Sequence, residues 1–343
     1  MLIPGDGIGP EVTAAARRVL DATGVALDWH TVHLGAPAID HAGDPVPPAT
    51  VTAIRAAGTA LKGPVATPQD GSMPSPNVGL RRALGLTFQL RRVEAFGLPP
   101  DRLFDVVIVR ETTEDLYAGI GFDATSSAAD AIRQASERAG TPLPRDAGLS
   151  IKYLSESSCR AVWDFAVAEA RRAGCSALTA AHKTAVMPHT DGIFLRVGRE
   201  IVERAGLQFD AVAVDTLAAR MATAPWSIQL IVAPNLYGDI LADLAGALAG
   251  GVGVVAGGNY GSSTTAVFEA AHGAAWRHAG RDTANPVGMV LSGALALDHL
   301  GHQRAAVAIR RAVRAVGSAV VDDDPRRLRT TALTERIIAA LEP

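Results

Sequence analysis

Short runs of apolar, β-branched residues alternate with amphipathic helical runs along most of this chain. Such alternation is typical of an α/β protein, in which helices connect strands that are buried on both faces of a sheet. The clearest predicted strands are residues 106–109, 211–214 and 229–232, and the clearest predicted helices are residues 10–22, 161–173, 192–205 and 286–300. Residues 122–150 instead mix Ser, Ala and Pro around one short helical patch, which indicates an arm outside the core.

Size and composition exclude several classes of protein. The 343 residues are enough for two domain-sized cores, and with 48% hydrophobic and 20% charged residues the chain is not disordered. A net charge of −3 gives no general attraction to nucleic acid or to an anionic membrane. The most apolar segment, 228–255, is interrupted by Asp239 and Asp243, so we do not expect it to span a membrane. The lack of a signal-peptide pattern and the two isolated cysteines, Cys159 and Cys175, predict a cytoplasmic protein without disulfides.

The opening segment, residues 3–11, reads Ile-Pro-Gly-Asp-Gly-Ile-Gly-Pro-Glu and predicts a tight turn from a strand into a helix. A dinucleotide fingerprint of the Rossmann type would need glycine where Pro10 stands. It would also need an acidic residue after a second strand, about 20 residues further on, which the chain does not offer. The segment therefore does not predict a Rossmann fold.

Two aspartates follow a predicted apolar strand at the start of a predicted helix. Asp239 and Asp243 are four residues apart, so both side chains project from one helical face. They could be surface charges that interact favourably with the helix dipole. A divalent cation between them explains the pair better, because Mg²⁺ prefers carboxylate oxygens. Asp215, at the end of predicted strand 211–214, is the candidate third ligand.

Four basic residues occupy positions where they could act on an anionic substrate. Arg110 directly follows the apolar strand 105–109, and Arg81 and Arg91 precede that strand. Each arginine alone could be a solvated charge, but three guanidinium groups together suit a di- or tricarboxylate, which they bind through paired hydrogen bonds. Lys183, one of only three lysines, follows the strand-like run 177–180, where a lysine near a metal could act as a base.

These motifs, in this order from Pro4 to Pro286, resemble those of the isocitrate/isopropylmalate dehydrogenase family. The resemblance implies an α/β fold with two α/β domains and an active-site cleft between them. It assigns residues 1–86 and 250–343 to a large domain, residues 87–114 and 157–249 to a small domain, and residues 115–156 to an arm that clasps a second copy. It also implies a homodimer with a shared active site, in which the ligand at the position of Asp215 comes from the neighbouring protomer.

The resemblance further implies oxidative decarboxylation of a 2-hydroxy di- or tricarboxylate, with Mg²⁺ or Mn²⁺ and a nicotinamide cofactor. Lys183 would help remove the hydroxyl proton, and Tyr117 would return a proton to the product enol. Asp215 would be a catalytic residue and also a metal ligand, together with Asp239 and Asp243. The substrate-binding residues implied by the resemblance are Ser75, Asn77, Arg81, Arg91 and Arg110.

One loop bears on the choice of cofactor. Residues 268–273 resemble the family's F-E-x-x-H-G loop, and Asn285 with Pro286 resembles the end of its adenine pocket. NAD-using members place an acidic residue where this chain has Arg277, a side chain that pairs instead with a 2′-phosphate. We therefore expect NADP in preference to NAD, with help from Arg326, Arg327 and Arg329, although the neighbouring Asp322 to Asp324 oppose this contribution. The cofactor-binding residues implied by the resemblance are Thr67, His272, Gly273, Arg277, His278 and Asn285.

The identity of the substrate, and the activity itself, leave alternatives open. Ser75 with Asn77 favours isocitrate, while homoisocitrate and isopropylmalate are competing substrates. Arg92 stands where the family usually has proline. Facing the pocket, Arg92 would suit a phosphonate analogue of isocitrate, whereas strand alternation would turn it away from the pocket. The rivals from other classes are a generic nucleotide-binding module and a non-catalytic regulatory subunit.

Overall fold

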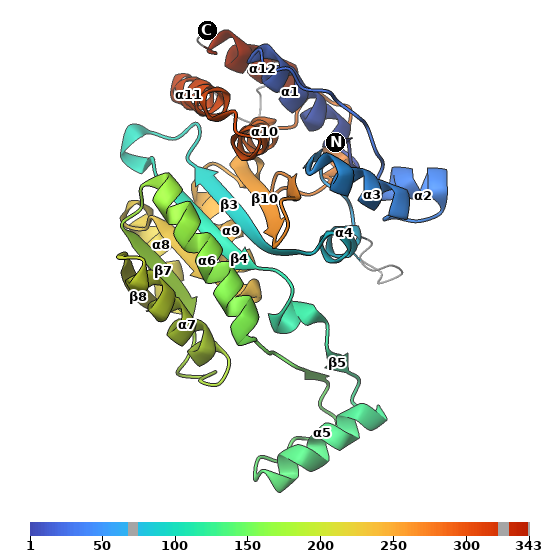
Figure 1. Ribbon diagram of the computed structural model, residues 1–343, viewed down its shortest axis with the longest axis vertical. Coiled ribbons are helices and arrows are strands. Elements are labelled where there is room, and N and C mark those ends of the chain that lie inside the picture. The colour runs from blue at the N-terminus through green and yellow to red at the C-terminus, as the bar shows by residue number, and fades with distance from the viewer. Residues whose placement is uncertain (68–74, 322–328, 342–343) are drawn as a thin grey trace.

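A computed structural model describes residues 1–67, 75–321 and 329–341 of the chain. Within these residues, nine strands form one mixed sheet that runs through the body of the molecule (Figure 1). In spatial order they are β1 (Leu2–Ile3), β2 (Thr59–Lys62), β11 (Ala266–Phe268), β10 (Val255–Gly261), β3 (Leu86–Glu94), β4 (Asp105–Glu111), β9 (Leu230–Ala233), β7 (Ala177–His182) and β8 (Gln208–Ala213). Strands β11, β10, β3 and β4 pair antiparallel, and the other pairs are parallel.

Helices cover both faces of this sheet. At the end that carries both termini, α1 (Gly9–Ala22), α10 (Val287–His299), α11 (Gln303–Ala319) and α12 (Thr330–Ala339) pack together (Figure 1). Helix α10 is apolar and buried on all sides, because it lies between β10 and the helices α1 and α11. Toward the other end, α6 (Glu156–Ala173) with α7 (Asp191–Arg204) and α9 (Asn235–Leu248) with α8 (Val214–Thr223) enclose β4, β9 and β7.

The remaining elements are short. Outside residues 121–150 they are the α-helices α2 (Ala36–Ala42), α3 (Pro48–Ala57) and α4 (Pro76–Leu84), and the 3₁₀ helices η1 (Pro100–Arg102), η2 (Asp115–Ala118), η3 (Pro225–Ser227), η4 (Val252–Val254) and η5 (Trp276–His278). In the parts of the chain that the structure describes, no helix is both long enough and apolar enough to cross a membrane.

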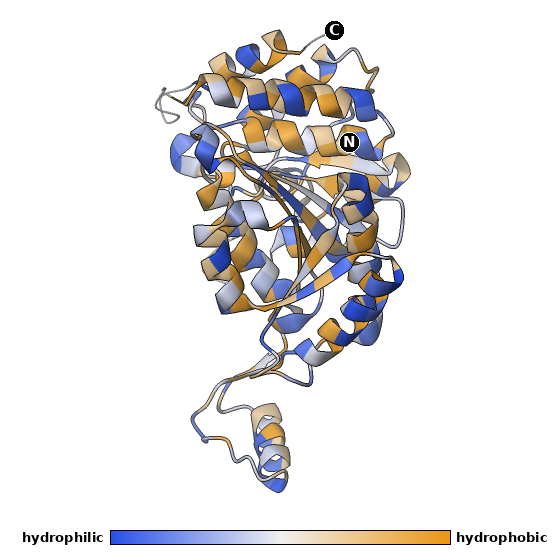
Figure 2. Cartoon of the chain, turned by 90° about the vertical axis from the view of Figure 1, so that its left-hand side faces the viewer, coloured by the Kyte–Doolittle hydropathy of each residue, from blue (hydrophilic) through white to orange (hydrophobic). Residues whose placement is uncertain are grey.

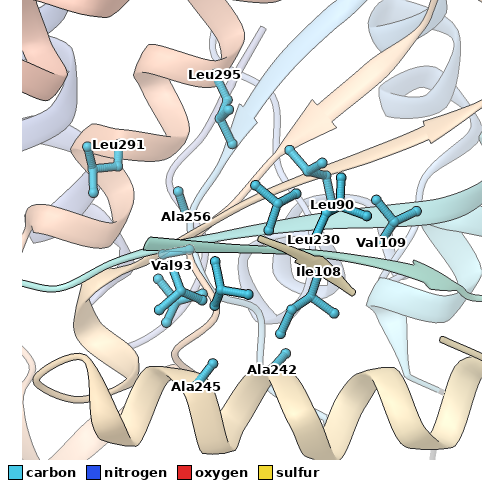
Figure 3. Close-up of a cluster of buried hydrophobic side chains, with 14 of the residues drawn as sticks. Leu90, Val93, Ile108, Val109, Leu230, Ala242, Ala245, Ala256, Leu291 and Leu295 are labelled. Carbon is cyan, nitrogen blue, oxygen red and sulfur yellow. The ribbon is translucent and has the colours of Figure 1, made fainter. Parts of the chain in front are cut away.

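The hydrophobic core occupies both faces of β3 and β4. Figure 3 shows Leu90 and Val109 on one face of these strands, and Val93 and Ile108 on the other face, toward Ala242 of α9. This alternation follows from the two-residue period of a strand. Burial of each large aliphatic side chain stabilises the fold by about 1.5–3 kcal/mol relative to exposure. The core therefore fixes the face of β3 on which each polar side chain lies.

Residues 121–150 form an arm that projects from the body of the molecule (Figures 1 and 2). Its base is the antiparallel pair β5 (Gly121–Phe122) and β6 (Leu149–Ser150), and its tip carries α5 (Ser127–Arg138), which Ser126 caps. Arg133 donates hydrogen bonds to the carbonyl oxygens of Ala124 and Pro144, and these bonds hold the tip together. A role for the arm in clasping a second copy, like the division of the body into two domains, stays a prediction.

The predicted strands and helices are all present, with ends that differ by a few residues. One difference bears on the site: β8 ends at Ala213 and α8 begins at Val214, so Asp215 lies in the first turn of a helix and does not end a strand. The β-branched Val214 favoured the strand interpretation. A carboxylate in the first helical turn interacts favourably with the helix dipole, which agrees with the observed position.

Candidate active site

A cavity of about 200 Å³ opens between β3, β4, the start of α9 and the loop that follows β11. The side chains and loop residues that line it are Lys62, Pro64, Val65, Asn77, Arg81, Gln89, Arg91, Arg110, Tyr117, Asp239, Glu269 and Ala270–Gly273. The structure thus brings together most of the predicted substrate-binding residues, one predicted metal ligand and two predicted cofactor-binding residues. It also adds three polar side chains that the sequence analysis did not assign to the site: Lys62, Gln89 and Glu269.

Two arginines reach the cavity from neighbouring strands. Gln89 of β3 pairs with Arg110 of β4 in the antiparallel ladder, and Arg91, two residues further along β3, lies on the same face. Both arginines lie against glycines. A Cβ on Gly257 would be 2.2 Å from a guanidinium nitrogen of Arg91, and a Cβ on Gly238 would be 2.7 Å from Cγ of Arg110. Any larger residue at either glycine would displace the arginine.

Positive charge exceeds negative charge on the cavity wall. The lining holds four cationic side chains and two carboxylates, an excess of two positive charges: Lys62, Arg81, Arg91 and Arg110 against Asp239 and Glu269. Burial lowers the pKa of Arg81 and of Arg91, and the nearby Arg110 lowers both further. A guanidinium group remains protonated at neutral pH despite such shifts. The cavity is therefore suited to a ligand with at least two negative charges.

A buried ion pair joins β2 to the loop after β11. Lys62 Nζ lies 2.5 Å from Glu269 Oε2, and the two side chains are 3% and 12% exposed. Burial opposes ionisation of Glu269, but the charges of Lys62 and Arg91 outweigh it and lower the pKa of Glu269 to about 2. Asn259 donates a hydrogen bond to the other carboxylate oxygen and accepts one from Gln89. Two features of the sequence could have drawn attention to Lys62 and Glu269: lysine is rare in this chain, and Glu269 is the glutamate of the F-E-x-x-H-G segment.

Asp239 is the centre of a hydrogen-bond network at the cavity. The hydroxyl of Tyr117 and the guanidinium of Arg110 each donate to one of its carboxylate oxygens. Arg110 also donates to Oδ1 of Asn235, the first residue of α9. Burial and the hydrogen bond to Asp239 raise the pKa of Tyr117, so its hydroxyl is protonated at neutral pH. The network therefore holds a protonated phenol at the cavity wall.

Asp243 lies one helical turn after Asp239 on α9, as predicted. Burial and the charge of Asp239 raise the pKa of Asp243, as expected for two carboxylates on one face of a helix. A divalent cation relieves the repulsion between two such carboxylates, and carboxylate oxygens are the ligands that Mg²⁺ and Mn²⁺ prefer. The two residues fit such a metal, although two carboxylates alone leave the set of ligands incomplete.

The other predicted catalytic residues form a separate ion pair. Lys183 follows β7 directly, and its Nζ lies 2.8 Å from Oδ1 of Asp215 in the first turn of α8. The hydrogen bond from Lys183 lowers the pKa of Asp215. Across the described ranges, no group of three or more His, Cys, Asp or Glu residues comes together to hold a metal. Asp215 thus does not join Asp239 and Asp243 within one chain.

Three predicted residues lie around the segment 68–74, which is outside the described residues. Thr67 donates a hydrogen bond to the hydroxyl of Ser75, 2.9 Å away, and Ser75 immediately precedes α4. Asn77, in the first turn of α4, donates to the carbonyl oxygen of Val65 and lines the cavity. Its Oδ1 is buried and makes no hydrogen bond with the described residues, so it can accept one from a ligand.

The predicted cofactor-binding residues extend outward from the cavity. His272 and Gly273 line it, and Nε2 of His272 is buried without a hydrogen-bond partner in the described part of the chain. Arg277 and His278 belong to the exposed η5. Asn285 accepts a hydrogen bond from the backbone N–H of Val287 at the start of α10. These unpaired and exposed polar groups fit an elongated polar cofactor. Arg326 and Arg327 lie outside the described residues.

Arg92 does not face this cavity, so the pocket-facing hypothesis for it is wrong. It follows Arg91 on β3 and therefore lies on the opposite face of the sheet, beside Leu90. There its Nε donates to Glu94 at 3.0 Å, and it lines a small internal cavity together with Glu169 of α6. The argument for a phosphonate substrate depended on an additional positive charge in the pocket, and the structure removes that argument.

A model of the isocitrate/isopropylmalate dehydrogenase family matches residues 1–340. The mitochondrial alpha chain of isocitrate dehydrogenase [NAD] from Bos taurus is 35% identical over 306 residues, which cover 88% of this chain and 78% of that protein. A mitochondrial regulatory subunit of isocitrate dehydrogenase [NAD] from Dictyostelium discoideum is 32% identical over 315 residues, or 91% and 82% of the two chains.

Solved structures of related enzymes resemble this chain over nearly its whole length. Isocitrate dehydrogenase from Methylococcus capsulatus superposes with a TM-score of 0.87 at 36% identity, covering 100% of this chain and 98% of that one. A beta-decarboxylating dehydrogenase from Thermococcus kodakarensis gives a TM-score of 0.82 at 32% identity, with 99% and 95% covered. The fold class expected from the sequence is confirmed.

Proposed function

This chain belongs to the isocitrate/isopropylmalate dehydrogenase family, and on that premise we propose that it oxidises and decarboxylates a 2-hydroxy acid whose third substituent is polar, with isocitrate as the first candidate. The observation that carries this proposal is the convergence of Arg81, Arg91 and Arg110 on one small cavity. Three guanidinium groups neutralise and orient carboxylates through paired hydrogen bonds. The excess of two positive charges suits the two carboxylates that isocitrate and isopropylmalate share, and the polar Ser75 and Asn77 make isocitrate the first candidate over isopropylmalate, whose third substituent is an alkyl group.

The residues around the cavity support distinct roles in this reaction. Arg91 and Arg110 hold substrate carboxylates, and Tyr117 keeps a proton that it can return to the product. Lys183, as the neutral amine, would accept the proton of the substrate hydroxyl. Neither Lys183 nor its partner Asp215 lines the cavity of its own chain, so the proposal places the pair at the cavity of a second copy. Asp239 and Asp243, with Asp215 of that copy, would hold Mg²⁺ or Mn²⁺. A bound ion would polarise the substrate oxygens and stabilise the charge that develops as CO₂ leaves.

We propose NADP as the hydride acceptor. Arg277 and His278 are exposed on η5, and their side chains make no hydrogen bond or ion pair with the described residues, so both are available for a 2′-phosphate. An arginine at this position cannot accept the hydrogen bond that a ribose 2′-hydroxyl donates. The mitochondrial relatives described above are named as NAD-type subunits, so the assay below compares NAD⁺ with NADP⁺.

A regulatory role is the second candidate function, because one of the relatives is named a regulatory subunit. Such a protein would bind isocitrate or nucleotide without turnover. The presence of Lys183, Tyr117 and the three aspartates in this chain favours catalysis.

One experiment separates these proposals. The purified protein is incubated with isocitrate, homoisocitrate or isopropylmalate and with NAD⁺ or NADP⁺, and reduced nucleotide and CO₂ are measured with Mg²⁺ and with a chelator. We expect Mg²⁺-dependent formation of both products, fastest with NADP⁺ and a substrate whose third substituent carries a carboxylate. Binding of isocitrate in calorimetry without turnover of any pair would support the regulatory role instead.

A further inference from the structure

Trp276 places a large aromatic ring in solvent beside the candidate active site. Its side chain is 60% exposed, and it occupies the first position of η5, directly before Arg277 and His278. An exposed indole is costly to hydrate, and such residues mark binding sites more often than smaller exposed apolar residues do.

The loop that carries Trp276 is anchored on the side near the cavity. The carbonyl oxygen of Ala274 accepts a hydrogen bond from the N–H of Ile8 at 2.8 Å. Gly7 allows this approach, because a Cβ there would lie 1.9 Å from the Ala274 oxygen. The opening turn of the chain thus fixes the loop two residues before the indole.

The far side of the loop is anchored as well. The carboxylate of Glu11 on α1 accepts hydrogen bonds from the N–H groups of Asp282 and Ala284. Thr331 of α12 donates its N–H to Asp282 at 2.8 Å. With both ends held, η5 is a fixed projection, and the exposure of Trp276 is not the result of a frayed terminus.

The backbone between the anchors turns Trp276 outward at some cost. Ala275 has φ of +41°, a left-handed conformation that residues other than glycine rarely adopt. A non-glycine residue in such a conformation costs on the order of 1–3 kcal/mol, and positions of this kind cluster at ligand-binding sites. From Ala275 the chain enters η5, closed by the hydrogen bond from His278 N–H to the Ala275 carbonyl oxygen.

The chemistry of η5 indicates one ligand. It carries an indole, a guanidinium and an imidazole on three successive exposed residues, a combination that suits a purine ring joined to a phosphorylated ribose. His272, which lines the cavity, precedes Trp276 by four residues, a span of at most about 14 Å along the backbone. An extended dinucleotide with its nicotinamide in the cavity reaches that far.

We propose that Trp276 stacks on the adenine ring of the nucleotide and supplies much of its binding energy, beside a 2′-phosphate held by Arg277 and His278. This inference rests on the proposed function and adds to it the residue that binds the purine. The expected consequence is that the adenosine half of the cofactor binds to this chain without the nicotinamide half.

The chain contains a matched control. Trp226, in η3 between α8 and β9, is 63% exposed, so it resembles Trp276 in solvent contact. It lies beside Ser227, which Arg220 holds, in a 3₁₀ helix that contacts β4 and α8, and it does not line the cavity. Replacement of Trp226 by Phe should leave nucleotide binding unchanged.

The test is a fluorescence and calorimetric titration of the full chain with NADP⁺, adenosine 2′,5′-bisphosphate and nicotinamide mononucleotide. We expect the two adenine ligands, and not the mononucleotide, to quench tryptophan emission in the wild type and in Trp226→Phe. This quenching should be absent in Trp276→Phe. Trp276→Ala should weaken adenosine bisphosphate binding roughly 5- to 100-fold, the usual range for losing one base–aromatic stack. Trp276→Phe, which keeps a ring, should stay close to the wild type in affinity.

Each outcome is decisive. If the wild type binds no nucleotide, the proposed function itself fails. If it binds NADP⁺ while Trp276→Ala has wild-type affinity and the quenching persists in Trp276→Phe, the function stands and the stacking inference is overturned. If Trp276→Ala instead lowers the oligomeric state in sedimentation without changing affinity, the indole is a contact between copies of the chain, which also overturns the inference. Circular dichroism of each variant verifies that it is folded.

Discussion

Lys183 Nζ lies 2.8 Å from Asp215 Oδ1, and within the described residues this pair does not reach the cavity that Tyr117 and Asp239 line. One half of the proposed machinery, the arginines, Tyr117 and two aspartates, therefore sits on one surface of the chain, and the lysine with the third aspartate sits on another. Ion pairs between exposed side chains stabilise a fold only weakly. A functional explanation for both halves is that two copies of the chain complete each other's sites.

Replacement of Lys183 by Met should abolish turnover and leave the fold intact. The Lys183 side chain is partly exposed and its partner Asp215 is exposed, so the melting temperature should change little. The measurement is the rate of NADPH formation together with the thermal unfolding curve. Turnover comparable to the wild type would remove the lysine from the reaction, and an unfolded variant would show that its role is structural.

Arg91 and Arg92 are neighbours in sequence that should differ sharply in function. Arg91 faces the cavity and Arg92 faces α6, so Arg91→Lys should lower kcat/KM roughly 10- to 100-fold, the effect of losing hydrogen bonds to a charged group. Arg92→Lys should leave kcat/KM for the substrate within a few-fold of the wild type. Steady-state kinetics on the two variants provides the comparison, and an equal loss in both would contradict the assigned faces.

Glu269 should make stability depend on pH in the acid range. Its pKa is lowered to about 2 in the folded protein, below its ordinary value of 4.5. The stabilisation from its ionised form is therefore fully present above about pH 4.5 and is lost as the pH falls toward 2. Urea unfolding of the wild type and of Glu269→Gln at several pH values measures this, and the variant should lose less stability over that interval.

At neutral pH, Glu269→Gln should destabilise the fold by about 3–5 kcal/mol, because Lys62 and Arg91 would remain buried without their carboxylate. Glu203→Gln is the control, since Glu203 is an exposed residue on α7 whose ion pair with Arg199 contributes little. If the free energy of unfolding depended on pH in the same way in Glu269→Gln and in the wild type, the ion pair would not contribute to stability as described.

The choice of nucleotide should depend on Arg277. Arg277→Asp introduces a carboxylate that accepts a hydrogen bond from a ribose 2′-hydroxyl and repels a 2′-phosphate. We expect kcat/KM to fall roughly 10- to 100-fold with NADP⁺, as when a charged hydrogen bond is lost, and to rise with NAD⁺. Preference for NAD⁺ in the wild type, unchanged in the variant, would contradict the NADP proposal.

Much of the site could be predicted from local patterns in the sequence. The helical spacing of Asp239 and Asp243 placed both on one face of α9, and Arg110 could be assigned to the end of an apolar strand. These features depend on a few neighbouring residues and on the period of a helix or strand. The motif order then identified the family, which the comparisons confirm.

The parts that were missed depend on contacts between distant segments. Lys62 and Glu269 are 207 residues apart and meet because β2 and β11 pair in parallel. Gln89 reaches Asn259 through the antiparallel pairing of β3 with β10. The face of Arg92 followed from strand alternation only once β3 was known to be regular at that point, since a bulge would have reversed it.

The claim that two copies share one active site is tested most directly by mixing inactive variants. Asp239→Asn and Lys183→Met are each prepared as inactive proteins, unfolded together and refolded as a mixture. In a mixed dimer one site receives the intact Asp239 of one copy and the intact Lys183 of the other. The account predicts recovery of about one quarter of the wild-type activity, because half of the dimers are mixed and each carries one complete site. A mixture of folded, dimeric variants that stays inactive would contradict it.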